Sequence, residues 1–334
     1  MVYTELFGVQ DNAIRPGIDN TSKKIVYVDG TNGSDTLQDG SSWKCALATV
    51  QAGVTAAGLG GIVYVMPKEM AAGATDPGNY TESIIIPATM AGLQIIGVSR
   101  GRTQGGLPQI KVGTTTTNPI LTIRAPGCRI ANLGINGDGG TGGGILLDDD
   151  GSTKTAIGTT IEECHFKNCV GTTATNAATG GAIMWAATGG AWQVLIRGNR
   201  FYKNVGDIVL KGTSQTVPQD VVVENNVFSG PASTVDCNIY AGGSGFNGIV
   251  IRNNSFQQKP AIGSGSNAKY IVLPTGTVGV ISNCRFGCQT NTTGGTKITF
   301  KSGGTGGDFP TTVHIVESYG QSITASESGE ITIA

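Results

Sequence analysis

Charged residues are scarce in this sequence, and neither sign forms a block. Lys and Arg number 22 and Asp and Glu 23 among 334 residues, which gives a formal net charge of −1. Charged residues make up 13% of the chain, about half the usual ~25%. Binding to the phosphates of DNA or RNA requires clustered Lys and Arg. The sequence therefore predicts no nucleic-acid partner.

Long apolar runs, a signal sequence and clustered metal ligands are missing as well. No apolar run approaches ~18 residues, the length of a membrane-spanning helix, so no membrane partner is expected. The first residues, MVYTELFGVQDNAIRPG, have neither the basic start nor the apolar stretch of a secretory signal. The histidines are His165 and His314, and the seven cysteines have no CxxC spacing. We expect no metal and no cofactor, and cysteines that stay reduced in a cytoplasm.

What the sequence does have is glycine and a repeat. Glycine contributes 53 residues, while 39% of the chain is hydrophobic, which argues against disorder. Six segments share one pattern, whose last apolar residue falls at positions 135, 166, 201, 228, 256 and 286, a spacing of 27 to 35 residues. They read IANLGI, IEECHF, IRGNRF, VENNVF, IRNNSF and ISNCRF. Self-similarity at this period is typical of a solenoid.

The repeats contain short β-branched runs such as DVVV and GIVI, and a second short run such as DIVL follows in most of them. Helical repeats would show apolar residues at a 3.6-residue spacing instead. Stretches of Gly, Thr, Ser and Asn lie between the runs, as between strands. We therefore predict the all-β fold class, with each repeat forming one coil of a β-helix. One internal column is predicted to contain Ile196, Val223, Ile251 and Ile281.

Each coil is predicted to turn at an asparagine, because Asn tolerates the left-handed backbone conformation. Stacked coils place Asn199, Asn226 and Asn254 about 4.8 Å apart, where their amides can hydrogen-bond along the axis. Cys164 and Cys284 occupy this place in the flanking coils. The last residue of the pattern is predicted to form an internal aromatic stack of Phe166, Phe201, Phe228, Phe256 and Phe286.

The outward residue before each turn alternates in charge. In successive coils it is Glu162, Arg197, Glu224, Arg252 and then Ser282. Coils stacked in register bring opposite charges next to one another, so we interpret this column as a structural ladder. The alternative, a catalytic carboxylate at Glu162 or Glu224, is less favoured because a neighbouring Arg holds the carboxylate ionised and engaged.

One amphipathic helix is predicted to cap the N-terminal end of the solenoid. It falls in WKCALATVQAGVTAAG, begins after Ser41 or Ser42 and ends at Gly58. Its apolar face is predicted to contain Leu47, Val50, Val54 and Ala57. The expected divisions are an extended N-terminal arm, a cap, the parallel β-helix, and C-terminal strands that form last coils, a second cap or an oligomerisation element. Their respective ranges are 1–24, 25–70, 71–290 and 291–334.

The chain resembles the right-handed parallel β-helix, or pectin-lyase-like, superfamily over residues 25–290. The resemblance is carried by IVYVDGTNGSD, GSSW, ALATVQAGVTAAG, GGIVYV, NYTESIIIP and LQIIGVS, followed by the repeated IxNNxF units. It implies the right-handed coil, and it is specific for fold rather than function, since this scaffold carries lyases, hydrolases, phage tailspikes and inert virion proteins. The chain is most similar to phage virion β-helix proteins of the decoration, spike or tailspike type. That likeness implies a homotrimer.

Candidate catalytic carboxylates lie in ILLDDDGS. Lyases of the resembled superfamily use a calcium-binding acidic cluster and an Arg or Lys base, and only Asp148 and Asp150 share a face of this strand. A solvated turn before glycine explains the same residues. Hydrolases of the superfamily carry a Gly-His-Gly motif, and neither histidine here has a glycine neighbour. A tailspike hydrolase needs only a carboxylate pair across a groove, and that alternative stays open.

The sequence favours a structural virion protein of a bacteriophage, assembled in the host cytoplasm. It would be a head decoration protein, a spike or a short fibre that presents a rigid β-helix. The expected partners are capsid or tail proteins of the same virion, with a bacterial surface glycan as a further partner. The alternatives are a tailspike-like polysaccharide depolymerase and, less favoured, a secreted polysaccharide lyase.

Overall fold

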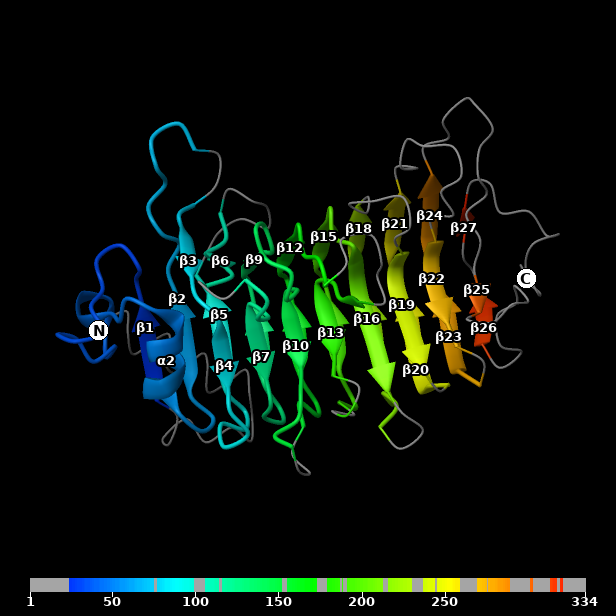
Figure 1. Cartoon of the computed structure of the whole chain (residues 1–334), viewed down its shortest axis with the longest axis horizontal. Coiled ribbons are helices and arrows are strands. Elements are labelled where there is room, and N and C mark those ends of the chain that lie inside the picture. Colours follow the sequence, from blue (N-terminus) through cyan, green and yellow to red (C-terminus); the bar gives the residue numbers. More distant parts are fainter. Residues whose placement is uncertain are drawn as a thin grey trace, which may run out of the picture.

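The computed structural model describes most of the chain between Lys24 and Gly320. The described residues are 24–74, 77–98, 106–113, 116–151, 155–172, 179–186, 188, 191–212, 216–229, 237–243, 245–258, 269–274, 276–288, 301–302, 313–316 and 319–320. They form a parallel β-helix, and its coils succeed one another along the long axis of the molecule (Figure 1). The predicted fold class is confirmed. The arm predicted over 1–24 lies outside the described residues except for Lys24.

Three parallel sheets form the walls of the solenoid. Sheet 1 contains, in order, β1 (Ile25–Val28), β2 (Ile62–Val65), β5 (Gln94–Gly97), β8 (Arg129–Ala131), β11 (Thr160–Glu162), β14 (Leu195–Arg197), β17 (Val222–Glu224), β20 (Asn247–Arg252), β23 (Val278–Ser282) and β26 (Val313–Val316). Two of these strands, β1 and β2, fall in the segment predicted as the cap. That segment therefore also contributes the first strands of the sheet.

The other two sheets follow sheet 1 within each coil. Sheet 2 contains β3 (Asn79–Thr81), β6 (Gln109–Lys111), β9 (Gly134–Asn136), β12 (His165–Lys167), β15 (Arg200–Tyr202), β18 (Val227–Ser229), β21 (Ser255–Gln258), β24 (Arg285–Cys288) and β27 (Tyr319–Gly320). Sheet 3 contains β4 (Ile84–Ile86), β7 (Leu121–Ile123), β10 (Ile145–Leu147), β13 (Ile183–Trp185), β16 (Gly206–Gly212), β19 (Cys237–Gly243), β22 (Lys269–Leu273) and β25 (Lys301–Ser302).

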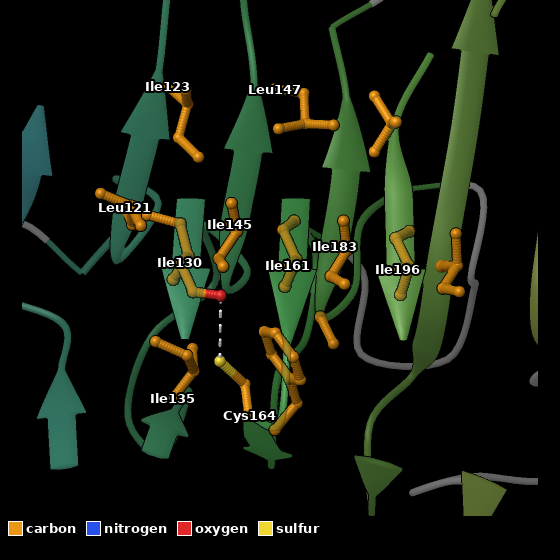
Figure 2. Close-up of a cluster of buried hydrophobic side chains, with 14 of the residues drawn as sticks. Leu121, Ile123, Ile130, Ile135, Ile145, Leu147, Ile161, Cys164, Ile183 and Ile196 are labelled. Carbon is orange, nitrogen blue, oxygen red and sulfur yellow. Dashed lines mark hydrogen bonds between the residues drawn. The ribbon is translucent and has the colours of Figure 1, made fainter. Parts of the chain in front are cut away.

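The strand register builds the core from like residues. Ile161 pairs with Ile196, and the same inward column continues through Val223, Ile251 and Ile281. All five side chains are fully buried. Figure 2 shows inward aliphatic side chains of sheets 1 and 3 gathered in one cluster between the sheets, among them Ile130, Ile145, Ile161 and Ile183. Each such buried side chain contributes about 1.5–3 kcal/mol.

The helix α2 (Val50–Ala57) lies at the N-terminal end of the solenoid (Figure 1). Val50, Val54 and Ala57 are buried, as the predicted apolar face requires. The helix ends at Gly58, whose φ of 69° lies in the left-handed region that glycine adopts without strain. No helix among the described residues is long and apolar enough to cross a membrane.

The predicted start of the helix was wrong. Thr49 is the N-cap residue, and its side-chain oxygen accepts a hydrogen bond from the Ala52 N–H at 3.2 Å. Ser42 instead precedes a short 3₁₀ helix, η1 (Trp43–Cys45). Leu47 cannot be helical because it forms a parallel bridge with Val28 beside strand β1.

Side chains fasten the helix to the first coil. The amide of Gln51 accepts a hydrogen bond from the Ile85 N–H at 2.7 Å and donates one to the Ile85 carbonyl at 3.3 Å. Strand β4, which contains Ile85, is the edge of sheet 3, so Gln51 satisfies backbone groups that another strand would otherwise bind. Glu82 in turn accepts hydrogen bonds from the N–H groups of Val50 and Gln51 at 2.9 and 2.8 Å. These contacts close the end of the solenoid.

Candidate functional site

The three predicted turn asparagines form a buried hydrogen-bonded column between sheets 1 and 2. Asn226 Oδ1 accepts from the N–H and from Nδ2 of Asn199, and Asn254 Oδ1 accepts from the same two groups of Asn226. Asn199 Oδ1 accepts from the Cys164 N–H at 2.9 Å. Each side-chain nitrogen also donates to the carbonyl of an inward residue, as Asn226 does to Ile196 at 3.0 Å. The column therefore links four successive coils.

Asparagine was predicted at positions 199, 226 and 254 because it tolerates the left-handed backbone conformation, and this explanation is wrong. The left-handed residue of each turn is the one before the stacked asparagine: Gly198, Asn225 and Asn253 have φ values of 66°, 57° and 56°. Asn199 and Asn226 do not have positive φ. Asparagine is used at the buried position because its amide can accept and donate at the same time, which satisfies backbone groups of two neighbouring coils.

The predicted phenylalanines stack inside sheet 2. Phe166 and Phe201 have ring centroids 5.1 Å apart, Phe201 and Phe228 4.8 Å, and Phe228 and Phe256 4.5 Å, with nearly parallel planes. These spacings match the distance between coils, because each ring sits at the same register position. The backbone of Phe286 pairs with Phe256, but its side chain lies outside the described residues.

Glu162 is the centre of a three-membered ion-pair cluster on the outer face of sheet 1. Its Oε1 accepts from Nε of Arg129, and its Oε2 accepts from Arg197 at 2.6 Å. The carboxylate side chain is only 5% exposed, whereas that of Arg197 is 48% exposed. Burial alone would raise the pKa of Glu162, but the hydrogen bonds and charges of Arg129 and Arg197 outweigh it and hold the pKa below its ordinary value.

The charged column continues with a separate ion pair. Arg252 contacts Glu224 Oε2 at 2.7 Å, and Ser282 follows in register. Arg197 is the register partner of both Glu162 and Glu224, and its guanidinium contacts Glu162. The column therefore consists of the Arg129–Glu162–Arg197 cluster followed by the Glu224–Arg252 pair. The sequence did not indicate Arg129 as a member of this column, because Arg129 lies two residues before Ala131, the register partner of Glu162. Its side chain reaches Glu162 diagonally.

Asp148 has an arginine partner that the sequence analysis did not identify. Nε of Arg124 donates to Asp148 Oδ2 at 3.0 Å. Both residues directly follow paired strands, since Ile123 pairs with Leu147. The signal was present in ILTIR and GILLD, whose charged residues end equivalent strands. The pairing engages the carboxylate of Asp148 on the outer wall of the solenoid.

The neighbouring Asp149 stabilises the turn that follows the strand. Asp149 Oδ1 accepts a hydrogen bond from the Gly151 N–H at 3.0 Å, and Asp149 bridges to Thr155 in antiparallel fashion. Asp150 also has an interaction partner. Among the described residues, no group of three or more His, Cys, Asp or Glu side chains is placed to hold a metal ion.

A second buried polar network was not anticipated. Asp207 in β16 accepts from Nδ2 of Asn204 at 2.9 Å and from Nδ2 of Asn238 at 2.7 Å. Asn204 Oδ1 accepts from the Cys169 N–H, which repeats the Asn199–Cys164 contact five residues further along the same coils. All these groups are buried. The Cys169–Asn204 and Asp207–Asn238 hydrogen bonds join neighbouring coils, and the Asn204–Asp207 hydrogen bond connects them within one coil, so the network stabilises coil stacking.

The described residues thus form a parallel β-helix whose polar columns connect its coils. The sequence matches no model of a known protein family and none of the curated proteins. Solved structures with a similar fold include the pectin methylesterase from Aspergillus niger, at 12% identity and a TM-score of 0.44 over 96% of this chain and 93% of that one. Another is ORF18 of Geobacillus virus E2, at 15% identity and a TM-score of 0.45 over 93% and 60%. The A-module of the Azotobacter vinelandii mannuronan C-5 epimerase AlgE6 is similar at 12% identity and 0.37 over 91% and 95%. These similarities concern the fold alone.

Proposed function

We propose that this chain is a structural protein of a bacteriophage particle that cleaves no substrate. The observation that carries the proposal is the environment of Glu162. A general acid needs a raised pKa and access to the substrate. Glu162 has a lowered pKa, its side chain is 5% exposed, and it is held by Arg129 and Arg197. Its chemistry is that of an ion pair that links coils.

The other outward carboxylates support the same function. Glu224 is paired with Arg252, and Asp148 with Arg124. A retaining or inverting glycosidase requires two carboxyl groups that face one bond across a groove. Here Glu162, Glu224 and Asp148 form ion pairs with arginines of adjacent coils. We therefore propose that these carboxylates stabilise the fold.

The particle assignment is supported by the thiols and by the architecture. Cys164 and Cys169 are fully buried free thiols, which fits folding in a reducing cytoplasm, where phage particles assemble. A solenoid held by backbone ladders, stacked rings and buried amides is a rigid rod. We propose that it serves as a head decoration, spike or short fibre, attached to capsid or tail proteins through residues 1–24 and assembled as a trimer.

Two measurements test this function. Purified protein incubated with host capsular and envelope polysaccharides is expected to release no reducing ends and no unsaturated uronates. Immunogold labelling of native phage particles is expected to place the chain on the particle, and deletion of residues 1–24 is expected to abolish its binding to capsids or tails. Polysaccharide cleavage that disappears in a folded Asp148→Asn variant would instead establish the depolymerase.

A further inference from the structure

The corner between sheets 1 and 2 has an unusual charge arrangement. Within four successive coils, four arginines flank the turns: Arg197 and Arg252 at the end of sheet 1, and Arg200 and Arg285 at the start of sheet 2. Arg197 and Arg200 share one coil, and the next coil has Glu224 and Val227 at the two positions. All four are exposed. We call these four residues the arginine edge. Such a concentration is notable in a chain whose formal net charge is −1.

The acidic partners at this corner lie beneath the arginines. The Glu162 side chain is 5% exposed against 48% for Arg197, and that of Glu224 is 14% exposed against 51% for Arg252. Each ion pair therefore presents its positive end to solvent. Guanidinium has five N–H donors, so an arginine that binds one carboxylate on its inner side keeps donors for a second acceptor.

The two arginines of sheet 2 differ from those of sheet 1 in their ion pairing. Within the described part of the chain, neither Arg200 nor Arg285 forms an ion pair. The register partners of Arg200 are His165 and Val227, and those of Arg285 are Ser255 and Tyr319, so none of them is acidic. Lys203 adds another exposed cation, and its Nζ lies 5.2 Å from the ring centroid of the exposed Tyr202. The corner therefore carries more cations than carboxylates: Arg197, Arg200, Lys203, Arg252 and Arg285 against Glu162, Glu163 and Glu224.

Exposed amides lie between the two rows of arginines. Asn225, Asn253 and Asn283 each precede a turn position of the buried column, have positive φ, and are exposed. Asn283 Nδ2 donates to Asn253 Oδ1 at 2.7 Å, so these amides also run along the axis. Amides donate to and accept from hydroxyl groups, whereas guanidinium groups bind carboxylates and phosphates in bidentate fashion. A ligand that fits both is a sugar polymer with acidic groups.

The spacing favours a linear ligand. Arg197 and Arg252 lie two coils apart, about 10 Å, and Arg200 and Arg285 lie three coils apart, about 14 Å, because adjacent strands are about 4.8 Å apart. The buried asparagine and phenylalanine columns beneath hold these positions rigid. A preorganised row loses little entropy when an extended chain binds along it.

We propose that the arginine edge binds an acidic polysaccharide that lies along the solenoid axis, without cleaving it. The inference adds a ligand to the proposed function, and it does not depend on attachment to a particle, since it is tested on the purified chain. Its failure would therefore leave the particle assignment standing. Conversely, a protein absent from phage particles could still bind through this edge.

Binding is tested with the full chain and three polymers at low and high salt. Alginate supplies carboxylates, a phosphodiester-linked teichoic acid supplies phosphates, and dextran is the neutral control. Saturable binding to at least one acidic polymer is expected, weakening steeply with salt, and the stronger of the two identifies the preferred acid. No binding, or equal binding of dextran, would overturn the proposal.

Paired variants locate the site. The double variant Arg200→Gln with Arg285→Gln is expected to weaken binding at least about tenfold, because two charge-assisted contacts are lost. The control, Lys24→Gln with Lys44→Gln, removes the same charge from exposed residues at the other end of the chain and is expected to bind as the unaltered protein does. Equal weakening in both variants would show that only overall charge matters and would refute the edge. Binding of poly-L-glutamate as tight as that of the acidic polysaccharides would assign the edge to a protein partner instead.

Discussion

The side-chain oxygen of Asn226 accepts two hydrogen bonds from Asn199, one from the backbone N–H at 2.9 Å and one from Nδ2 at 3.1 Å. Asn226 thus provides the acceptor for the donors at the turn of the preceding coil, while the N–H of Asn226 donates to Oδ1 of Asn254 in the next coil. Because Asn226 is 1% exposed, water cannot replace these contacts. The stability of each turn therefore depends on the next coil.

Replacing Asn226 by alanine is expected to lower the free energy of unfolding by about 1–3 kcal/mol, since buried donors of Asn199 lose their acceptor. Chemical denaturation monitored by circular dichroism measures the change. The control is Asn225→Gly at the adjacent exposed position, whose φ of 57° suits glycine. It should leave the stability nearly unchanged, and an equal loss in both variants would contradict the role of the buried column.

Gly198 is expected to resist substitution more than Gly58. Both have positive φ, 66° and 69°, so alanine strains the backbone at either site. At Gly198 an added Cβ would also meet the carboxylate of Glu163, whereas nothing lies within 4 Å at Gly58. Thermal unfolding should show about 1–2 kcal/mol lost for Gly58→Ala, the cost of a left-handed backbone for a residue with a Cβ, and a larger loss for Gly198→Ala. Equal losses would mean that the Glu163 side chain moves away freely.

The two carboxylates of the charged column should differ in their contribution. Glu162→Gln is expected to cost about 2 kcal/mol, because a nearly buried acceptor of two charged groups is lost. Glu224→Arg places a third positive charge between Arg197 and Arg252, and we expect about 1 kcal/mol or less because its partner is half exposed. Urea denaturation in low and high salt compares them. A larger cost at Glu224 would show that the exposed pair dominates.

Glu162 also predicts a pH dependence. Its folded-state pKa is lowered relative to the ordinary value of 4.5, so its stabilising contribution is fully present above pH 4.5 and is lost as the pH falls through the folded-state value. The stability difference between the unaltered chain and Glu162→Gln should therefore shrink below pH 4.5. Denaturation at a series of pH values measures it, and a difference independent of pH would contradict the ion-pair account.

The cysteines should divide by burial in their reaction with thiol reagents. Burial raises the pKa of Cys128, Cys164 and Cys169 to about 12, and the thiolate is the reactive form. Cys45 is partly exposed and is expected to be alkylated in the folded protein, whereas the other three react only after unfolding. Peptide mapping by mass spectrometry separates the sites. Rapid alkylation of Cys164 in the folded chain would contradict the stacked coil around it.

The sequence by itself determined the coil and its interior. Residues such as Ile196 and Phe201 recur at one position of each repeat, and hydrophobic burial acts on every coil in the same way, so their inward columns could be predicted. The alternating charges of Glu162, Arg197, Glu224 and Arg252 could also be predicted, because these residues occupy one position of successive repeats. The end of the helix at Gly58 followed from local backbone preference.

Only the tertiary structure decided which groups meet and which remain exposed. Arg124 and Asp148 end equivalent strands, but their contact depends on how loops of unequal length bring the two coils into register. The shift of the left-handed residue to Asn225 follows from the hydrogen bonds that Asn226 must make across coils. The depth of Glu162 beneath Arg197 arises because contacts between stacked coils, rather than the order of residues within one coil, set the exposure of each side chain.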